Sequence, residues 1–173
     1  MVIFDANFLL LLLDPDVDVP TDPATGQPLT RAKERVEHLI SGLSQQREAI
    51  GIPTPVVAEI LVHAGQAGPE YLGIIGNSSR FRILPFDMRA AVEVAAMTST
   101  AIAGGDKKAG SAAPWQKVKV DRQIAAIGIM ERASTVYADD HGVVRLAKLA
   151  GLATVSSWEL PLPPEDPQGC LDV

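Results

Sequence analysis

Cysteine is nearly absent from this chain of 173 residues, which contains only Cys170. One thiol cannot form an intramolecular disulfide, so the fold has to be stabilised without such cross-links. The scarcity of cysteine fits a reducing compartment, and we expect a cytoplasmic protein.

The chain also lacks an apolar run long enough to cross a membrane. Its run of phenylalanine and leucine at residues 8–13 has six members, whereas a transmembrane helix needs about 20. A signal peptide would begin with positive charge, but here Asp5 precedes the run and Asp14 follows it. We therefore expect no membrane association and interpret the run as the buried first helix of a globular protein.

A surplus of basic residues is missing as well. The net charge is −6 and the pI is about 5.0, so nucleic-acid binding would require a local basic patch or a metal ion. Hydrophobic residues make up 47% of the chain and charged residues 21%. These values are typical of one globular domain and exclude a disordered chain.

The hydrophobic pattern predicts strands that alternate with helices. Strands are expected at residues 1–4, 50–53, 81–86, 135–138 and 153–155, and helices at 7–13, 31–47, 54–64, 70–76, 87–102, 119–131 and 141–150. Thr30, Thr54 and Asp87 are suitable N-caps for three of these helices. Such alternation is typical of an α/β fold with helices on both faces of a parallel sheet.

The remaining segments are rich in proline, glycine or polar residues. We interpret residues 14–30 and 104–118 as insertions in one domain that spans residues 1–155. Residues 156–173 form a proline-rich C-terminal tail in this interpretation. The sequence contains no internal repeat, and neither insertion has the character of a domain boundary.

Acidic residues directly follow two of the predicted strands. Asp5 follows the first strand, and Asp139 and Asp140 follow the strand at residues 135–138. Because ligands bind at the carboxyl ends of strands in parallel sheets, we expect these acids to share one site. Glu59 lies among apolar neighbours in its helix and Asp121 lies near the start of another, so both are further candidates.

Carboxylates that lie close together repel one another unless a cation neutralises them. At 4 Å the repulsion between two unit charges is about 4 kcal/mol at an effective dielectric constant of 20. Carboxylate ligands without cysteine favour Mg²⁺ or Mn²⁺ over zinc. Such a metal site typically activates water for attack on a phosphate ester, so phosphodiester hydrolysis is the first hypothesis.

Four short motifs, taken in order, resemble the PIN domain, a family of metal-dependent ribonucleases that includes the VapC-type toxins. They are VIFDAN at residues 2–7, PVVAEIL at 55–61, VDRQIAA at 120–126 and VYADD at 136–140. The resemblance covers residues 1–155. It implies a three-layer α/β/α fold with a central parallel sheet, and an endoribonuclease that depends on Mg²⁺ or Mn²⁺.

The resemblance also implies which residues form the site. The catalytic groups and metal ligands would be the acids of the four motifs: Asp5, Glu59, Asp121 and Asp140. Asn7 would support them. The sequence leaves open whether Asp139 or Asp140 faces the metal. The chain departs from the pattern at Ala138, where many family members carry threonine or serine.

The partners implied by the resemblance are an RNA substrate, a second copy of the chain and the antitoxin of a type II toxin–antitoxin pair. The antitoxin would present an arginine to the acids. RNA contact is expected from the richest basic stretch, which contains Lys107, Lys108, Trp115, Lys117 and Lys119. Lysines and an aromatic ring suit a single strand, although the same composition also fits a solvated, flexible loop.

Two other functions compete with the ribonuclease. A non-catalytic PIN-like scaffold that binds RNA or protein would be indicated by the loss of acids, but all four are present. An aspartate-nucleophile phosphatase of the haloacid dehalogenase type also begins with a strand and an aspartate. Its second aspartate lies two positions later, where this chain has Asn7, and the ribonuclease is therefore the preferred hypothesis.

Overall fold

The computed structural model describes residues 1–164, and within them five strands form one parallel sheet. The strands are Val2–Phe4 (β1), Ile50–Pro53 (β2), Phe81–Leu84 (β3), Thr135–Tyr137 (β4) and Ala153–Val155 (β5). Their order across the sheet is β3-β2-β1-β4-β5. The predicted parallel sheet is confirmed, and each predicted strand is present.

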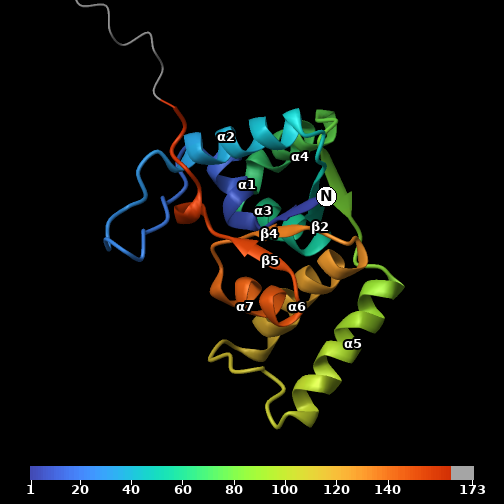
Figure 1. The fold of residues 1–173 in the computed structure, drawn as a ribbon. Helices are drawn as coiled ribbons and strands as arrows, with labels where there is room; N and C mark the ends of the chain where they lie inside the picture. The colour runs from blue at the N-terminus through green and yellow to red at the C-terminus, as the bar shows by residue number, and fades with distance from the viewer. Residues whose placement is uncertain (165–173) are drawn as a thin grey trace, which may run out of the picture.

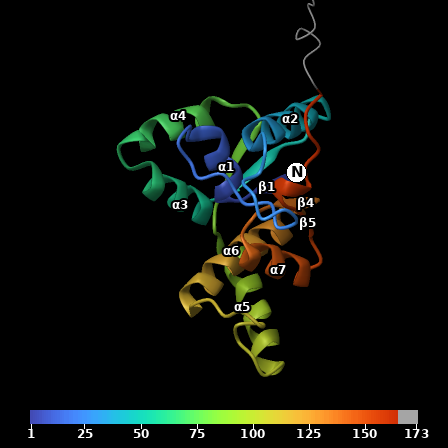
Figure 2. The same cartoon turned by 90° about the vertical axis from the view of Figure 1, so that its left-hand side faces the viewer.

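Helices cover both faces of the sheet (Figure 1). One layer contains α1 (Ala6–Leu13), α2 (Ala32–Gln45), α3 (Thr54–Ala64) and α4 (Gly68–Asn77), and the other contains α5 (Met88–Ala103), α6 (Trp115–Met130) and α7 (His141–Leu149). The view in Figure 2 shows the same two layers from the side. The predicted three-layer α/β/α architecture is therefore confirmed.

The central strand β1 is buried on both faces, which fixes the position of the residue that follows it. Ile3 and Phe4 have no exposed surface. The Phe4 ring lies 5.4 Å from the rings of both Phe8 and Tyr137, measured between centroids. Aromatic packing of this kind joins β1, α1 and β4 into a rigid support for the loops above them.

The strand order reverses direction at β1, since β2 lies on one side of it and β4 on the other. Phe4 is paired with Tyr137 in parallel register, and the Asp5 amide donates to the Tyr137 carbonyl at 3.0 Å. The chain segments after β1 and β4 therefore leave the sheet at the same level. In open α/β sheets this reversal point is where ligands bind.

Helix α5 is largely exposed, although its many alanine and valine residues are typical of a buried helix. Only Ala90 is buried in it, whereas Met88 is 78% exposed and Val92 is 63% exposed. The helix packs against α6 along one side and extends beyond the sheet (Figure 1). Its alanine and valine content indicates a helix that can be buried, but composition does not show how much of the helix other elements cover.

The N-cap predictions have mixed outcomes. The Asp87 side chain caps α5 by accepting from the Ala90 amide at 3.0 Å, as predicted. Thr30 is not the cap of α2, because Arg31 precedes that helix in the left-handed conformation with φ of 55°. Thr54 lies inside α3, and its hydroxyl instead accepts from the Phe86 amide.

Two predicted boundaries shift. Helix α6 begins at Trp115, so residues 115–118 of the expected second insertion belong to a helix. The first residues of the expected tail pack on the body: Ser157 is fully buried, Leu160 is 5% exposed, and Arg35 donates to the Leu160 carbonyl. Residues 165–173 of that tail, with Cys170, lie outside the described residues.

None of the helices in residues 1–164 has the length and apolar character needed to span a membrane.

Candidate active site

The acids of the four motifs line one small pocket at the carboxyl ends of β1 and β4. Its volume is about 40 Å³, and its lining consists of Asp5, Asn7, Glu59, Lys117, Asp121, Ile124, Asp140 and Val143. One water occupies about 10–15 Å³ by the same kind of measure, so the pocket has the size of an ion or a few waters. It is much smaller than the pockets that enclose whole ligands.

Asp5 is held at this pocket by the end of β1. It precedes the first residue of α1, yet its side chain makes no capping hydrogen bond and is 3% exposed. Burial raises the pKa of its carboxyl from 3.8 to about 7, and the nearby charges of Glu59 and Asp140 act in the same direction. The Ala6 amide and Lys117 oppose this shift without cancelling it, and the buried carboxylate is available to a ligand.

Asp121 lies in the second turn of α6 and is 2% exposed. Its Oδ2 atom is buried and has no hydrogen-bond partner among the described residues. A Cβ atom added at Gly142 would lie 2.1 Å from this oxygen, so only glycine leaves room for the Asp121 carboxylate. Buried carboxylate oxygens are normally paired, and an unpaired one is an available ligand for a cation.

Asp140 serves both the helix that follows it and the pocket. Its Oδ1 atom caps α7 by accepting from the amides of Gly142 and Val143 at 2.8 and 3.1 Å. Its Oδ2 atom lies 2.8 Å from the Lys117 ammonium on the pocket side. The cap fixes the orientation of the carboxylate and leaves one oxygen facing the site.

Asp139, the alternative to Asp140, is not brought into the pocket. Its carboxylate accepts from the Ser157 amide at 2.7 Å and from the Ser157 hydroxyl at 2.8 Å. It therefore ties the end of β4 to the short 3₁₀ helix Ser157–Glu159. The structure gives the two neighbouring aspartates separate tasks and places only Asp140 among the other acids.

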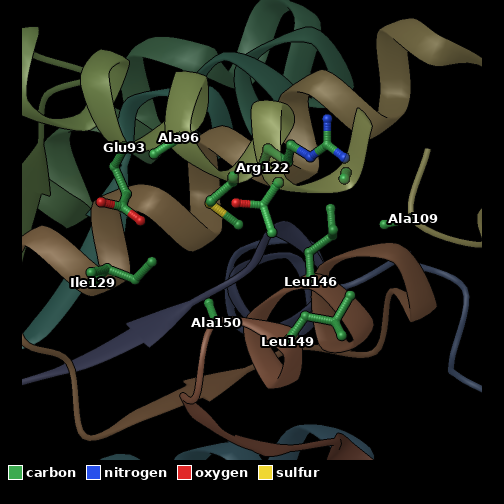
Figure 3. A pocket seen from close by; sticks show the side chains of 11 residues that line it. Glu93, Ala96, Ala109, Arg122, Ile129, Leu146, Leu149 and Ala150 are labelled. Carbon is green, nitrogen blue, oxygen red and sulfur yellow. The ribbon is translucent and has the colours of Figure 1, made fainter. Parts of the chain in front are cut away.

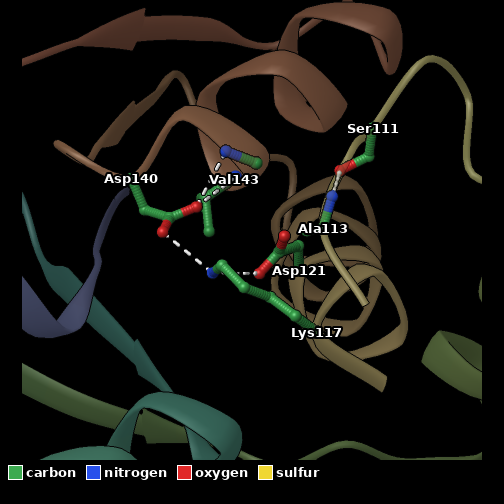
Figure 4. A network of polar contacts seen from close by, with 7 residues as sticks. Ser111, Ala113, Lys117, Asp121, Asp140 and Val143 are labelled. Carbon is green, nitrogen blue, oxygen red and sulfur yellow. Dashed lines mark hydrogen bonds and ion pairs between the residues drawn. The ribbon is translucent and has the colours of Figure 1, made fainter. Parts of the chain in front are cut away.

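Lys117 lies between two of the acids (Figure 4). Its ammonium is 3.2 Å from Asp121 Oδ1 and 2.8 Å from Asp140 Oδ2, and its side chain is 46% exposed. Burial lowers the Lys117 pKa, but the hydrogen bond to Asp140 and the charges of both aspartates outweigh this effect, so the net shift is upward. The sequence predicted a substrate contact for Lys117, whereas the structure places it inside the acidic pocket.

Glu59 and Asn7 complete the lining from the opposite layer. Glu59 lies in the middle of α3 and is exposed on one side, and the partial burial of its carboxyl at the pocket raises its pKa. Lys117 opposes that shift, while Asp140 and Asp121 add to it. Asn7 lies in the first turn of α1, is exposed, and faces the same pocket.

The acids share their electrostatic environment. Burial raises the pKa of Asp121, and Lys117 reduces the shift without cancelling it. For Asp140, burial acts upward, but the hydrogen bonds from Lys117 and from the amide of Val143 bring the net pKa below its usual value. In this environment a positive charge placed among these acids is stabilised.

The donor set fits a hard divalent cation in its chemistry. It offers carboxylate and amide oxygens without sulfur, and one buried carboxylate oxygen is unpaired. Within residues 1–164, however, no three His, Cys, Asp or Glu side chains are already arranged as a metal-binding group. The acids are gathered in the pocket, with the Lys117 ammonium between two of them.

Substituting Asp5 with asparagine is expected to stabilise the metal-free protein at pH 8. The folded Asp5 carboxyl takes up a proton below about pH 7 and the unfolded one below 3.8. The folded state therefore binds more protons in this window, and stability falls as the pH rises from about 4 to about 7. At 1.36 kcal/mol per pKa unit the loss is at most about 4 kcal/mol.

Melting temperatures at pH 5 and pH 8 in EDTA measure this effect. We expect the wild type to lose stability at pH 8 by more than D5N does. The control is D18N, which changes an exposed aspartate of the 14–30 loop and should behave like the wild type. Equal pH dependence in D5N and the wild type would contradict the raised pKa of Asp5.

Asp139→Ala is expected to destabilise the fold without weakening metal binding. The change leaves the Ser157 amide and hydroxyl without their shared acceptor, which costs about 1–3 kcal/mol. Urea unfolding measures the loss, and Mn²⁺ titration of the folded variant measures the affinity. A large loss of Mn²⁺ affinity in D139A would show that Asp139, and not only Asp140, belongs to the site.

The basic segment forms its own contacts beside the pocket. The Lys107 ammonium lies 5.2 Å from the centre of the Trp115 ring, and the Arg122 guanidinium lies 5.4 Å from it. The Lys108 ammonium donates to the Ala113 carbonyl at 2.9 Å. Of the five residues expected to contact substrate, Lys107 and Lys119 are exposed without an ion pair to an acid in residues 1–164.

A second, larger cavity shares no lining residue with the acidic pocket (Figure 3). It has a volume of about 470 Å³ and opens between α5, α6 and α7, where Met97, Leu146 and Leu149 contribute apolar walls. It contains none of the predicted catalytic or metal-binding residues. The metal-dependent chemistry expected from the acids is therefore assigned to the small pocket, although the other cavity is larger.

Two features of the site were not predicted from the sequence: the pairing of Lys117 with the acids, and the close approach of Gly142 to Asp121. Lys117 lies four residues before Asp121, which places both on one face of a helix, but the helix was expected to begin only at Lys119. Gly142 follows Asp140 by two residues, and nothing in the local sequence indicates that its missing side chain leaves room for Asp121. An earlier helix start at Trp115 would have identified the Lys117–Asp121 pair.

Two solved structures share this architecture. VapBC2 from Rickettsia felis, bound to a DNA fragment from its promoter, matches with a TM-score of 0.60 at 15% identity, over 90% of this chain and 98% of that chain. DNA-bound VapBC from Salmonella typhimurium matches with a TM-score of 0.55 at 16% identity, over 90% and 97%. The fold is shared. No protein-family profile and no curated protein matches the sequence, so the likeness rests on structure alone.

Proposed function

We propose that this protein is an endoribonuclease that depends on Mg²⁺ or Mn²⁺ and hydrolyses RNA phosphodiester bonds. The observation that carries the proposal is the gathering of Asp5, Glu59, Asp121 and Asp140 in one pocket. These acids come from distant parts of the chain and meet where the strand order reverses. Carboxylates gathered this closely repel one another, and a bound divalent cation would remove the repulsion that Lys117 leaves.

The shared fold supports the more specific proposal of a toxin. Both neighbouring structures are VapBC complexes bound to DNA, and the motifs resemble VapC-type toxins. We therefore propose that the chain is the toxin of a type II toxin–antitoxin pair and forms a homodimer. An antitoxin arginine inserted among the acids would block the pocket through charge-assisted hydrogen bonds.

In this proposal each acid has a defined task. Asp5, Asp121 and Asp140 would hold the cation, and Glu59 would contribute a further carboxylate ligand from α3, in the opposite helix layer. When bound, the metal supplies charge stabilisation for the phosphate and a more acidic water. The α7 cap fixes Asp140, the Gly142 gap accommodates Asp121, and Asn7 would orient a neighbouring carboxylate or water at the exposed side of the pocket.

RNA would approach along the α6 side of the pocket. Lys119 and Lys107 offer exposed ammonium groups there, and Trp115 provides a ring whose faces are at present engaged by Lys107 and Arg122. Phosphate contacts of this kind supply affinity without sequence preference. Lys108 would help to hold the loop through its bond to Ala113.

One observation favours a second candidate, a non-catalytic scaffold that binds RNA or protein. The Lys117 ammonium already neutralises part of the acidic pocket without a metal. A protein that had lost metal chemistry would retain its acids through such pairing. This candidate predicts binding to nucleic acid or protein without cleavage.

Cleavage of a mixed RNA substrate tests the proposal. Purified protein is incubated with Mg²⁺, with Mn²⁺ and with EDTA, beside the variant D5N and the exposed-loop control D18N. We expect cleavage by the wild type and D18N with either metal, and none with EDTA or with D5N. If folded wild-type protein binds Mn²⁺ but cleaves no RNA, the ribonuclease proposal is wrong and the scaffold is the better supported function.

A further inference from the structure

Lys117 occupies a position that a simple carboxylate site does not require. Its ammonium contacts one oxygen of Asp121 and one of Asp140 (Figure 4). Both oxygens belong to acids that would hold the cation in the proposed function. A lysine that pairs with two carboxylates leaves fewer oxygens free for any other positive charge.

The influence of Lys117 extends over the whole pocket. Its ammonium lies in the small pocket that Asp5, Glu59, Asp121 and Asp140 line, and it forms ion pairs with the last two. Without a positive charge, ionised acids in a partly buried site repel one another. Lys117 is therefore the counter-ion of the acids in the metal-free pocket.

We propose that Lys117 is a built-in competitor of the divalent cation: it neutralises the acids in the metal-free protein and is displaced when the metal binds. The proposal rests on the metal site of the proposed function. It implies that Lys117 sets the metal concentration at which the enzyme becomes active, and that the metal-free protein is kept folded with its acids in place.

The local structure allows the displacement. Val118, the next residue of α6, is fully buried, so the backbone stays in place while the lysine side chain moves. The Lys117 side chain is 46% exposed, and its flexible stem can carry the ammonium into solvent. The paired oxygens of Asp121 and Asp140 would then face the pocket beside the unpaired Asp121 Oδ2.

Mn²⁺ affinity measures the competition directly. Free Mn²⁺ is counted by electron paramagnetic resonance during titration of the wild type, K117M and K148M. Lys148 is an exposed lysine in the last turn of α7 and is the matched control. If Lys117 fills the pocket more than about 90% of the time, its removal lowers the Kd for Mn²⁺ at least about tenfold, while K148M changes it little.

Chemical labelling tests the displacement itself. Lysines of the wild type are acylated briefly with and without Mg²⁺, and the modification of Lys117 and Lys148 is quantified by peptide mass spectrometry. We expect Mg²⁺ to increase the labelling of Lys117 several-fold and to leave Lys148 unchanged. This readout requires no catalytic activity and separates displacement from a general effect of charge.

The outcomes distinguish this inference from the proposed function. Tighter Mn²⁺ binding by K117M together with Mg²⁺-dependent labelling of Lys117 supports the inference. Equal affinity of K117M and wild type, or unchanged Lys117 labelling in protein that binds metal, overturns it and leaves the metal site intact. No Mn²⁺ binding by any of the three proteins overturns the metal site and the inference together.

Discussion

Asp121→Asn is expected to reduce metal-dependent RNA cleavage by at least about 100-fold. The substitution removes the charge of a carboxylate that is 2% exposed and carries an unpaired buried oxygen. Loss of a residue that merely orients a metal ligand typically costs about 10–100-fold, and loss of a ligand should cost at least as much. Initial cleavage rates at saturating Mn²⁺ measure the effect.

The fold should survive this change, which allows a clear interpretation. Asparagine has nearly the shape of aspartate, and burial of the charged Asp121 is already unfavourable, as its raised pKa shows. The melting temperature in EDTA should therefore not fall much below that of D18N. Wild-type cleavage rates in folded D121N would remove Asp121 from the active site.

Gly142→Ala is expected to produce a similar loss of cleavage without touching any acid. The added Cβ would lie 2.1 Å from Asp121 Oδ2 and 3.0 Å from Asp140 Oδ1. Both carboxylates would have to shift, and a displacement of about 1 Å at a catalytic centre can cost about 100-fold. Cleavage rates and Mn²⁺ affinity should both decrease.

A second glycine-to-alanine change provides the control. Gly73 lies in α4, and a Cβ added there meets nothing within 4 Å. Alanine favours a helix over glycine by about 1 kcal/mol, so G73A should be at least as stable as the wild type and fully active. If G142A also retained full activity, the tight fit between Gly142 and Asp121 would have no functional importance.

Much of this site was predictable because strand ends are readable in the sequence. A buried apolar strand followed by an acid places Asp5 at the carboxyl end of β1 in a parallel sheet, and the same pattern places Asp140 just after β4. These two positions depend only on alternation and burial, which local sequence expresses well. Glu59 and Asp121 needed the resemblance of the motifs, since an acid within a helix is usually exposed.

The remaining features depend on contacts that local sequence does not encode. Asp139 is held away from the other acids by Ser157, which lies 18 residues further along the chain, and only Asp140 lines the pocket. The task of Lys117 depends on where α6 begins, and the glycine- and proline-containing segment before it obscured that boundary. The exposure of α5 depends on which elements reach it, and its own residues do not specify them.

Diffraction from a crystal soaked in Mn²⁺, recorded near the manganese absorption edge, tests the central claim most directly. We predict an anomalous peak in the pocket, bounded by the carboxylates of Asp5, Asp121 and Asp140, with the Lys117 ammonium moved away. An empty pocket at millimolar Mn²⁺, with Lys117 still between Asp121 and Asp140, would contradict the assignment of these acids to a metal-dependent nuclease.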